Sequence, residues 1–385
     1  MIKRAKISSR ALLLSLAASL AALMFACGAP QPVGTGGGGA STSGGTVRLQ
    51  GTGASFPAPI YQKWVSEYGK AHPNIEIDYQ STGSGQGIKD ISGGTVAFGA
   101  TDKPMSDDEL KAAKGGELLH IPTVLGAVVI TYNLPGNPEL KFSPDVIADI
   151  YLGKITKWDD ARIKADNPGA QLPASNIAVV ARADGSGTSA VFTEYLSKVS
   201  PEWKEKVGTG TNPNWPTGQR AAKNEGVTAA IKQNPNTLGY VELAYAVQIK
   251  LPVAALKNKA GNFVKPTLEA VTAAAAESLA STPDDMRVSI TDAAGATAYP
   301  ISSYTYILAY KNQTDAVRGK ALVDFLWWAL HDGQAVTKDP QYPYAALPAE
   351  VVKRAEAKIN SITSDGKPLR SYCVLRIAYL KTGRS

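Results

Sequence analysis

Three short glycine-rich turns recur along this chain, each between a strand-like segment and a helix-like one. They read GTGASFP (residues 51–57), STGSGQG (81–87) and DGSGTSA (184–190). Strand patterns that alternate with helical patterns of ordinary length indicate an α/β fold with mostly parallel sheets. In such sheets ligands bind beyond the carboxyl ends of the strands, where helix N-termini present unpaired N–H groups. The turns therefore predict an anion site built from backbone and hydroxyl donors.

The expected elements follow from hydrophobic periodicity and helix start signals. Ser106 precedes Glu109 by three residues, which predicts a capping box, and Ser143 before Pro144 predicts another helix N-cap. We expect strands at 46–53, 75–80, 123–133, 176–184, 238–243 and 303–310, and helices at 57–71, 106–113, 143–153, 188–199 and 316–333.

The net charge of +7 is concentrated at the two ends of the 385-residue chain. Residues 1–26 carry four basic groups and no acid, and residues 365–385 carry five basic groups and one acid. The body between them is close to neutral, which argues against a nucleic-acid-binding surface.

The first 46 residues read as a targeting segment and a tether. A basic stretch and the apolar run ALLLSLAASLAALMFA end at Cys27, which predicts a signal peptide at 1–26 and lipidation of Cys27. An incidental cysteine and ordinary signal-peptidase cleavage are the alternatives. The Gly/Ser-rich residues 27–46 predict a flexible tether. Cys373 is too distant to suggest a disulfide framework or a metal cluster with Cys27.

Catalytic motifs are weak in this sequence. GSGTSA matches a variant of the dinucleotide fingerprint, but an acidic strand end about 20 residues later is missing. The serines of the glycine turns do not fit the Gly-x-Ser-x-Gly nucleophile elbow. The histidines, His72, His120 and His331, stand without ligand-spaced companions. We therefore expect a recognition protein that is not an enzyme and holds neither a metal nor a cofactor.

The body of the chain resembles the periplasmic phosphate-binding proteins of bacterial phosphate-specific ABC importers. The matching stretches run in the family's order from about residue 47 to 369. They are GTGASFPAPIYQKW, YQSTGSGQGIKDI, FGATDKPMS, IYLGKITKWDD, NIAVVARADGSGTSAVFTEYL, VGTG, LGYVELAYA and YPIS.

The resemblance implies a set of phosphate-binding residues. Arg182 would bind phosphate oxygens, Asp184 would fix its guanidinium, and Asp102 would be the carboxylate that faces the anion. Considered singly, Ser55 and Ser84 could be simple helix N-caps, Arg182 with Asp184 an ordinary ion pair, and Asp102 a turn residue. The implied ligand set is Ser55, Phe56, Ser84, Asp102, Arg182, Ser186, Gly187 and Thr188.

The resemblance also implies a type II periplasmic-binding-protein fold with the ligand between two α/β lobes. Lobe 1 would comprise residues 47–123 and 304–369, lobe 2 residues 124–303, and residues 370–385 a basic C-terminal extension. The expected protein is a lipid-anchored, extracytoplasmic monomer that binds phosphate with high affinity and delivers it to a membrane permease. A sulfate-like oxyanion binder and, less favoured, a phosphatase-type enzyme are the alternatives.

Overall fold

The computed structural model describes residues 45–370, so the signal peptide, Cys27 and most of the C-terminal extension lie outside the described residues. Its main feature is an eight-stranded sheet in the order β2-β1-β3-β11-β4-β8-β6-β7. The strands are β1 (Val47–Gly53), β2 (Ile75–Ser81), β3 (Phe98–Thr101), β4 (Leu118–Asn133), β6 (Ala178–Arg182), β7 (Gln219–Ala221), β8 (Thr237–Glu242) and β11 (Ser302–Tyr310).

The expectation of a mostly parallel sheet is only partly right. β1 pairs in parallel with β2 and β3, and β6 pairs in parallel with β7 and β8. The contacts of β11 with β3, of β11 with β4 and of β4 with β8 are antiparallel. Two parallel groups are therefore joined by two long strands that run antiparallel to each other, β11 being antiparallel to β3 and β4 to β8, and the pattern of buried residues alone does not reveal strand direction.

β4 connects the two parallel groups. Its first part pairs with β11, through Leu118 to Ala127, and its last part pairs with β8, through Val128 to Asn133. All but its last residue are buried, as expected for a strand covered on both faces. The lobe boundaries at 123/124 and 303/304 fall within β4 and β11, and they stay a prediction.

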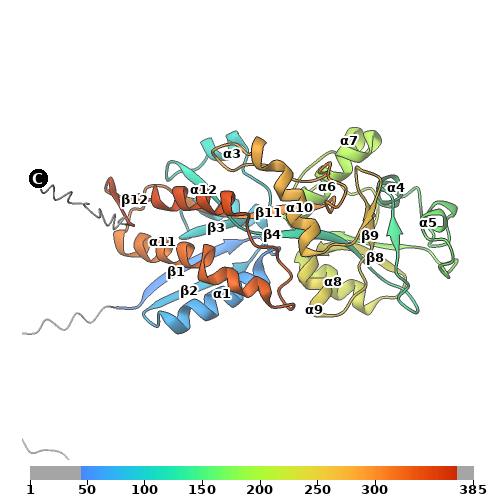
Figure 1. The fold of residues 1–385 in the computed structure, drawn as a ribbon, viewed down its shortest axis with the longest axis horizontal. Helices are drawn as coiled ribbons and strands as arrows, with labels where there is room; N and C mark the ends of the chain where they lie inside the picture. Colours follow the sequence, from blue (N-terminus) through green and yellow to red (C-terminus); the bar gives the residue numbers. More distant parts are fainter. Residues whose placement is uncertain (1–44, 371–385) are drawn as a thin grey trace, which may run out of the picture. The chain divides into compact units, whose positions relative to one another are not determined.

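Helices cover the sheet, and early and late parts of the chain lie side by side. Figure 1 shows α11, drawn in orange-red, beside α1 and β1, drawn in blue, and Trp64 of α1 donates a hydrogen bond to the Gly333 carbonyl. The helices are α1 (Ala58–Ala71), α2 (Ser84–Ser92), α3 (Asp107–Lys111), α4 (Pro144–Tyr151), α5 (Ala161–Asp166), α6 (Gly187–Val199), α7 (Pro201–Lys206), α8 (Lys223–Gln233), α9 (Leu243–Gln248), α10 (Leu268–Ser278), α11 (Ala316–Leu330) and α12 (Ala349–Asn360), with 3-10 turns η1 (Leu279–Ser281) and η2 (Asp332–Lys338).

Smaller elements complete the described chain. They are a sheet of β10 (Phe263–Val264), β9 (Ala255–Lys257) and β5 (Lys141–Phe142), and a hairpin of β12 (Thr363–Ser364) and β13 (Lys367–Pro368). Within residues 45–370, no helix is both long and apolar enough to cross a bilayer.

The helix start signals had mixed outcomes. The capping box of Ser106 and Glu109 is confirmed, with both of its hydrogen bonds present. Ser143 holds the N-cap position of α4, but its hydroxyl donates to Asp166 at 2.8 Å instead of capping the helix. The backbone N–H of Ser143 also donates to Asp166 Oδ2, at 2.7 Å, so this residue is held by α5, a contact that sequence spacing could not reveal.

Candidate anion-binding site

The three glycine turns meet in the folded chain. The Gly85 N–H donates to the Gly185 carbonyl at 2.8 Å, which joins the second turn to the third. Gly187 begins α6 so close to the second turn that a Cβ there would lie 2.3 Å from Ser84 Oγ and 2.4 Å from Asp102 Oδ2. Only glycine permits this approach. The turns expected to form one site are therefore in direct contact.

Arg182 ends β6 and is 1% exposed. Its Nε and Nη2 donate to the two carboxylate oxygens of Asp184 at 2.9 and 2.6 Å, which fixes the plane of the guanidinium. Burial acts to raise the pKa of Asp184, but the hydrogen bonds and charge of Arg182 outweigh it and hold that pKa below its ordinary value. The Nη1 of Arg182 is buried and has no hydrogen-bond partner among residues 45–370. A buried guanidinium nitrogen of this kind is suited to an anionic oxygen.

Asp102 follows β3 and is 2% exposed. Its Oδ1 accepts from the Thr305 hydroxyl at 2.9 Å and its Oδ2 from the Ser84 hydroxyl at 3.4 Å. Burial raises the pKa of the Asp102 carboxyl to about 7, and the hydrogen bonds and the charge of Arg182 only partly oppose that rise. The carboxyl can therefore accept or give a proton near neutral pH.

The serines of the three turns have different local roles. Pro57 and Gly83 occupy the N-cap positions of α1 and α2, so Ser55 and Ser84 are not the simple N-caps that sequence alone allowed. Ser186 does cap α6, since its hydroxyl oxygen accepts from the Ser189 N–H at 3.0 Å. With the Ser189 N–H bound by this cap, the N–H groups of Gly187 and Thr188 at the start of α6 are left without a partner within the helix.

The first turn is held by two tyrosines from distant parts of the chain, Tyr245 of α9 and Tyr344 between η2 and α12. The Tyr245 hydroxyl donates to the Ser55 carbonyl at 2.6 Å, and the Tyr344 hydroxyl donates to the Phe56 carbonyl at 2.7 Å. Tyr344 also lies 3.0 Å from Oε2 of Glu242, a buried carboxyl whose pKa burial raises well above its ordinary value. Sequence analysis missed these groups because they lie in ordinary strand and helix patterns.

Asn224 is the second contribution that sequence analysis missed. It lies in the first turn of α8 and is fully buried. Its Nδ2 lies 2.9 Å from Ser55 Oγ and 3.2 Å from Thr188 Oγ1, so it links the first and third glycine turns. A buried amide is a common structural feature, and nothing in the segment KNEGV signals this role.

Groups suited to acid–base or metal chemistry lie elsewhere or are absent from the described chain. His120 is buried, accepts from the Met105 N–H, and has its pKa lowered by burial to about 3. Residues 45–370 contain no group of three His, Cys, Asp or Glu side chains that could hold a metal ion. The described site is thus one of donors and a single carboxyl of adjustable charge.

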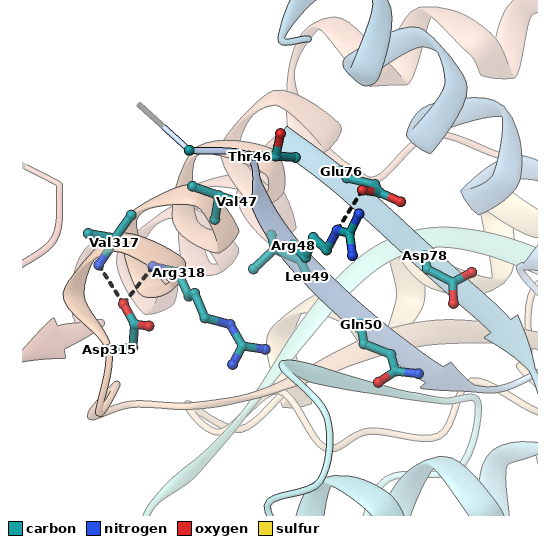
Figure 2. A pocket seen from close by; sticks show the side chains of 11 residues that line it. Thr46, Val47, Arg48, Leu49, Gln50, Glu76, Asp78, Asp315, Val317 and Arg318 are labelled. Carbon is teal, nitrogen blue, oxygen red and sulfur yellow. Dashed lines mark hydrogen bonds and ion pairs between the residues drawn. The ribbon is translucent and has the colours of Figure 1, made fainter. Parts of the chain in front are cut away.

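A separate surface pocket of about 690 Å³ lies where the described chain begins. Figure 2 shows that some of its polar groups bind one another: Arg48 pairs with Glu76, and Asp315 accepts hydrogen bonds from the backbone N–H groups of Val317 and Arg318. A second pocket, of about 410 Å³, is lined by Asp102 and Ser303. Of these two pockets, the second borders the glycine-turn site.

Comparisons with known proteins identify the family of this chain. Residues 40–332 match the model of the PBP superfamily domain. The chain is 43% identical over 342 residues to phosphate-binding protein PstS of Methanocaldococcus jannaschii, covering 82% of this chain and 87% of that protein. It is 44% identical over 325 residues to phosphate-binding protein PstS of Pasteurella multocida, covering 83% of this chain and 93% of that protein.

Solved structures share the fold at lower sequence identity. The ancestral soluble variant of the human phosphate-binding protein matches with a TM-score of 0.66 at 18% identity, covering 84% of this chain and 99% of that chain. A high-affinity periplasmic phosphate-binding protein, PfluDING, was solved with phosphate bound. It matches with a TM-score of 0.64 at 20% identity, covering 81% of this chain and 93% of that chain. The two-lobed periplasmic-binding-protein fold expected from the sequence is confirmed.

Proposed function

Because this chain belongs to the PstS family of phosphate-binding proteins, we propose that it binds inorganic phosphate outside the cytoplasmic membrane and delivers it to an ABC importer. The single observation that carries the proposal for this chain is the meeting of three glycine turns around Arg182 and Asp102. The family consists of binding proteins, which supports a non-enzymatic role. We further propose a high-affinity monomer whose partner is a membrane permease.

The guanidinium geometry supports a defined role for Arg182. Asp184 occupies its Nε and one side of Nη2, so Nη1 and the remaining Nη2 hydrogen form the fork that would bind two phosphate oxygens. The N–H groups at the start of α6 and the hydroxyls of the three turns would bind the remaining oxygens. The proposed ligand set is Ser55, Phe56, Ser84, Asp102, Arg182, Ser186, Gly187 and Thr188, with Asp184 in support.

Calorimetric titration of the purified protein with phosphate, sulfate and arsenate tests the function. Phosphate and arsenate should bind tightly, because both are tetrahedral and both carry an acidic hydrogen near neutral pH, whereas sulfate should bind weakly. Equal binding of sulfate would favour the alternative of a general oxyanion binder. Turnover of a phosphate ester would favour a phosphatase.

Replacing Cys27 by serine should release the protein from the membrane or block its maturation. We propose lipidation at Cys27 because it is the sole cysteine before Cys373 and stands where the apolar signal run ends. Fractionation of cells into membrane pellet and supernatant, with immunoblotting, measures the effect. An unchanged pellet fraction with normal processing would argue against the anchor, and Cys373→Ser is the matched control that should stay in the pellet.

Deleting residues 371–385 should leave phosphate affinity within about twofold of that of the full chain. The described fold is closed before the deletion: Leu369 N–H donates to the Ile362 carbonyl at 3.1 Å, and the Arg370 guanidinium stacks 3.6 Å from the Trp327 ring. Calorimetry measures the affinity. Deleting 363–385 instead, which removes β12 and β13, should lower the melting temperature. A large affinity loss on the shorter deletion would show that the extension reaches a lobe or the site.

A further inference from the structure

Asn224 connects two of the three glycine turns, yet it belongs to no part of the ligand set implied by the sequence. Its Nδ2 donates to Ser55 Oγ at 2.9 Å and to Thr188 Oγ1 at 3.2 Å, and its backbone N–H also donates to Ser55 Oγ at 3.3 Å. All three residues are at most 5% exposed. A buried donor shared between two hydroxyls restricts how both can bond.

The orientation of the Asn224 amide is fixed by its other end. The Glu242 backbone N–H donates to Asn224 Oδ1 at 3.1 Å, and only the oxygen of an amide side chain can accept that bond. The NH₂ group must therefore face Ser55 and Thr188. The assignment follows from the backbone donor and does not depend on how the hydroxyl hydrogens are placed.

The backbone that presents Asn224 is also tightly held. Lys223, just before it, adopts a left-handed φ of 62°, a conformation that costs a non-glycine residue energy and persists only where its surroundings enforce it. Its N–H donates to Asp184 Oδ1 at 2.8 Å. The carboxylate that orients Arg182 therefore also anchors the start of α8.

A hydroxyl carries two acceptor positions and a single hydrogen. Among the described residues, Ser55 Oγ receives two hydrogen bonds and Thr188 Oγ1 receives one, and neither donates any. Their hydrogens are thus left available for an acceptor. We propose that Asn224 is a positioning residue for phosphate binding, which occupies both acceptor positions of the Ser55 hydroxyl and one of the Thr188 hydroxyl so that both hydroxyls donate to the anion. This inference rests on the proposed function and adds a residue to its site.

The test is the affinity of two variants, Asn224→Asp and Asn224→Ala, measured by phosphate calorimetry at pH 8. Aspartate has nearly the shape of asparagine but only accepts, so it should draw both hydroxyl hydrogens toward itself and away from phosphate. Each hydrogen bond lost to a charged partner corresponds to roughly a tenfold to hundredfold loss. We expect Asn224→Asp to lower phosphate affinity more than a hundredfold and Asn224→Ala to lower it only about tenfold. A merely structural role predicts the reverse order, because alanine leaves the larger cavity.

A double-mutant cycle separates hydrogen-bond capture from the added negative charge. In a Ser55→Ala background, the carboxylate introduced by Asn224→Asp can accept a hydrogen bond from only one of the two hydroxyls. The loss of phosphate affinity caused by Asn224→Asp should therefore be at least severalfold smaller in that background. Additive losses would mean that charge repulsion alone acts, and they would overturn the inference. If Asn224→Asp does not fold, as judged by its melting temperature, the same cycle with Asn224→Ala decides, and additive losses overturn it again.

The wild-type titration keeps the two proposals apart. Wild-type protein that binds no phosphate contradicts the proposed function itself. Wild-type protein that binds phosphate while both Asn224 variants bind it equally well contradicts only the role of Asn224.

Discussion

Replacing Asp102 by asparagine should remove most of the discrimination between phosphate and sulfate. Phosphate carries at least one acidic hydrogen near neutral pH and can donate it to an ionised Asp102, whereas sulfate has none. A buried carboxylate that faces an unprotonated oxyanion loses its partner, at a cost of several kcal/mol. Because the pKa of the Asp102 carboxyl is about 7, sulfate at pH 8 can bind only the minority of the protein in which Asp102 is protonated, so wild type should favour phosphate by roughly tenfold or more, which corresponds to about 1.4 kcal/mol.

The pH dependence gives the same prediction a second readout. Burial raises the pKa of Asp102 to about 7, so the carboxyl gains a proton as the pH falls through that value. Protonated Asp102 can donate to sulfate, so sulfate affinity should rise as the pH falls and drop by roughly tenfold per unit above pH 7. Asp102→Asn should bind sulfate with an affinity that varies little with pH.

Competition calorimetry at pH 6 and pH 8 measures both effects. Arg182→Ala is the comparison variant: it should weaken phosphate and sulfate alike, because the guanidinium binds either tetrahedral anion. Wild-type protein that binds sulfate as well as phosphate at pH 8 would refute both the ligand assignment and the role of Asp102.

Replacing Gly187 by alanine should reduce phosphate affinity by about tenfold to a hundredfold and should also lower the stability of the fold. The added Cβ would lie 2.3 Å from Ser84 Oγ and 2.4 Å from Asp102 Oδ2, so the second and third turns would have to separate. Overpacking of this kind costs about 1–3 kcal/mol. Alanine is the better helix former at the start of α6, so the helix itself gains.

Gly210→Ala is the matched control for this substitution. A Cβ at Gly210 meets only the Asn212 nitrogen, at 4.0 Å, so affinity should not change. Phosphate calorimetry gives the affinities, and thermal melting without phosphate reports the stability. An unchanged affinity for Gly187→Ala would show that the two turns need not touch when the anion is bound.

Local features of the site could be read from the sequence because they depend on residues close together in the chain. Arg182 and Asp184 are two positions apart at the end of a strand, and their ion pair forms as expected. The capping box of Ser106 and Glu109 likewise forms within three residues. Backbone geometry alone brings such groups together, so their types and spacing suffice.

Strand direction and the site contacts between residues far apart in the sequence were decided only by the tertiary structure. The Thr305 hydroxyl donates a hydrogen bond to Asp102, which is 203 positions away in the sequence, and Asn224 donates one to Ser55, which is 169 positions away. These contacts depend on how β4 and β11 join the two parallel groups of strands, and hydrophobic periodicity shows which residues are buried but not which strands pair. The raised pKa of Asp102 has the same origin, because desolvation arises only when distant segments close around the carboxyl.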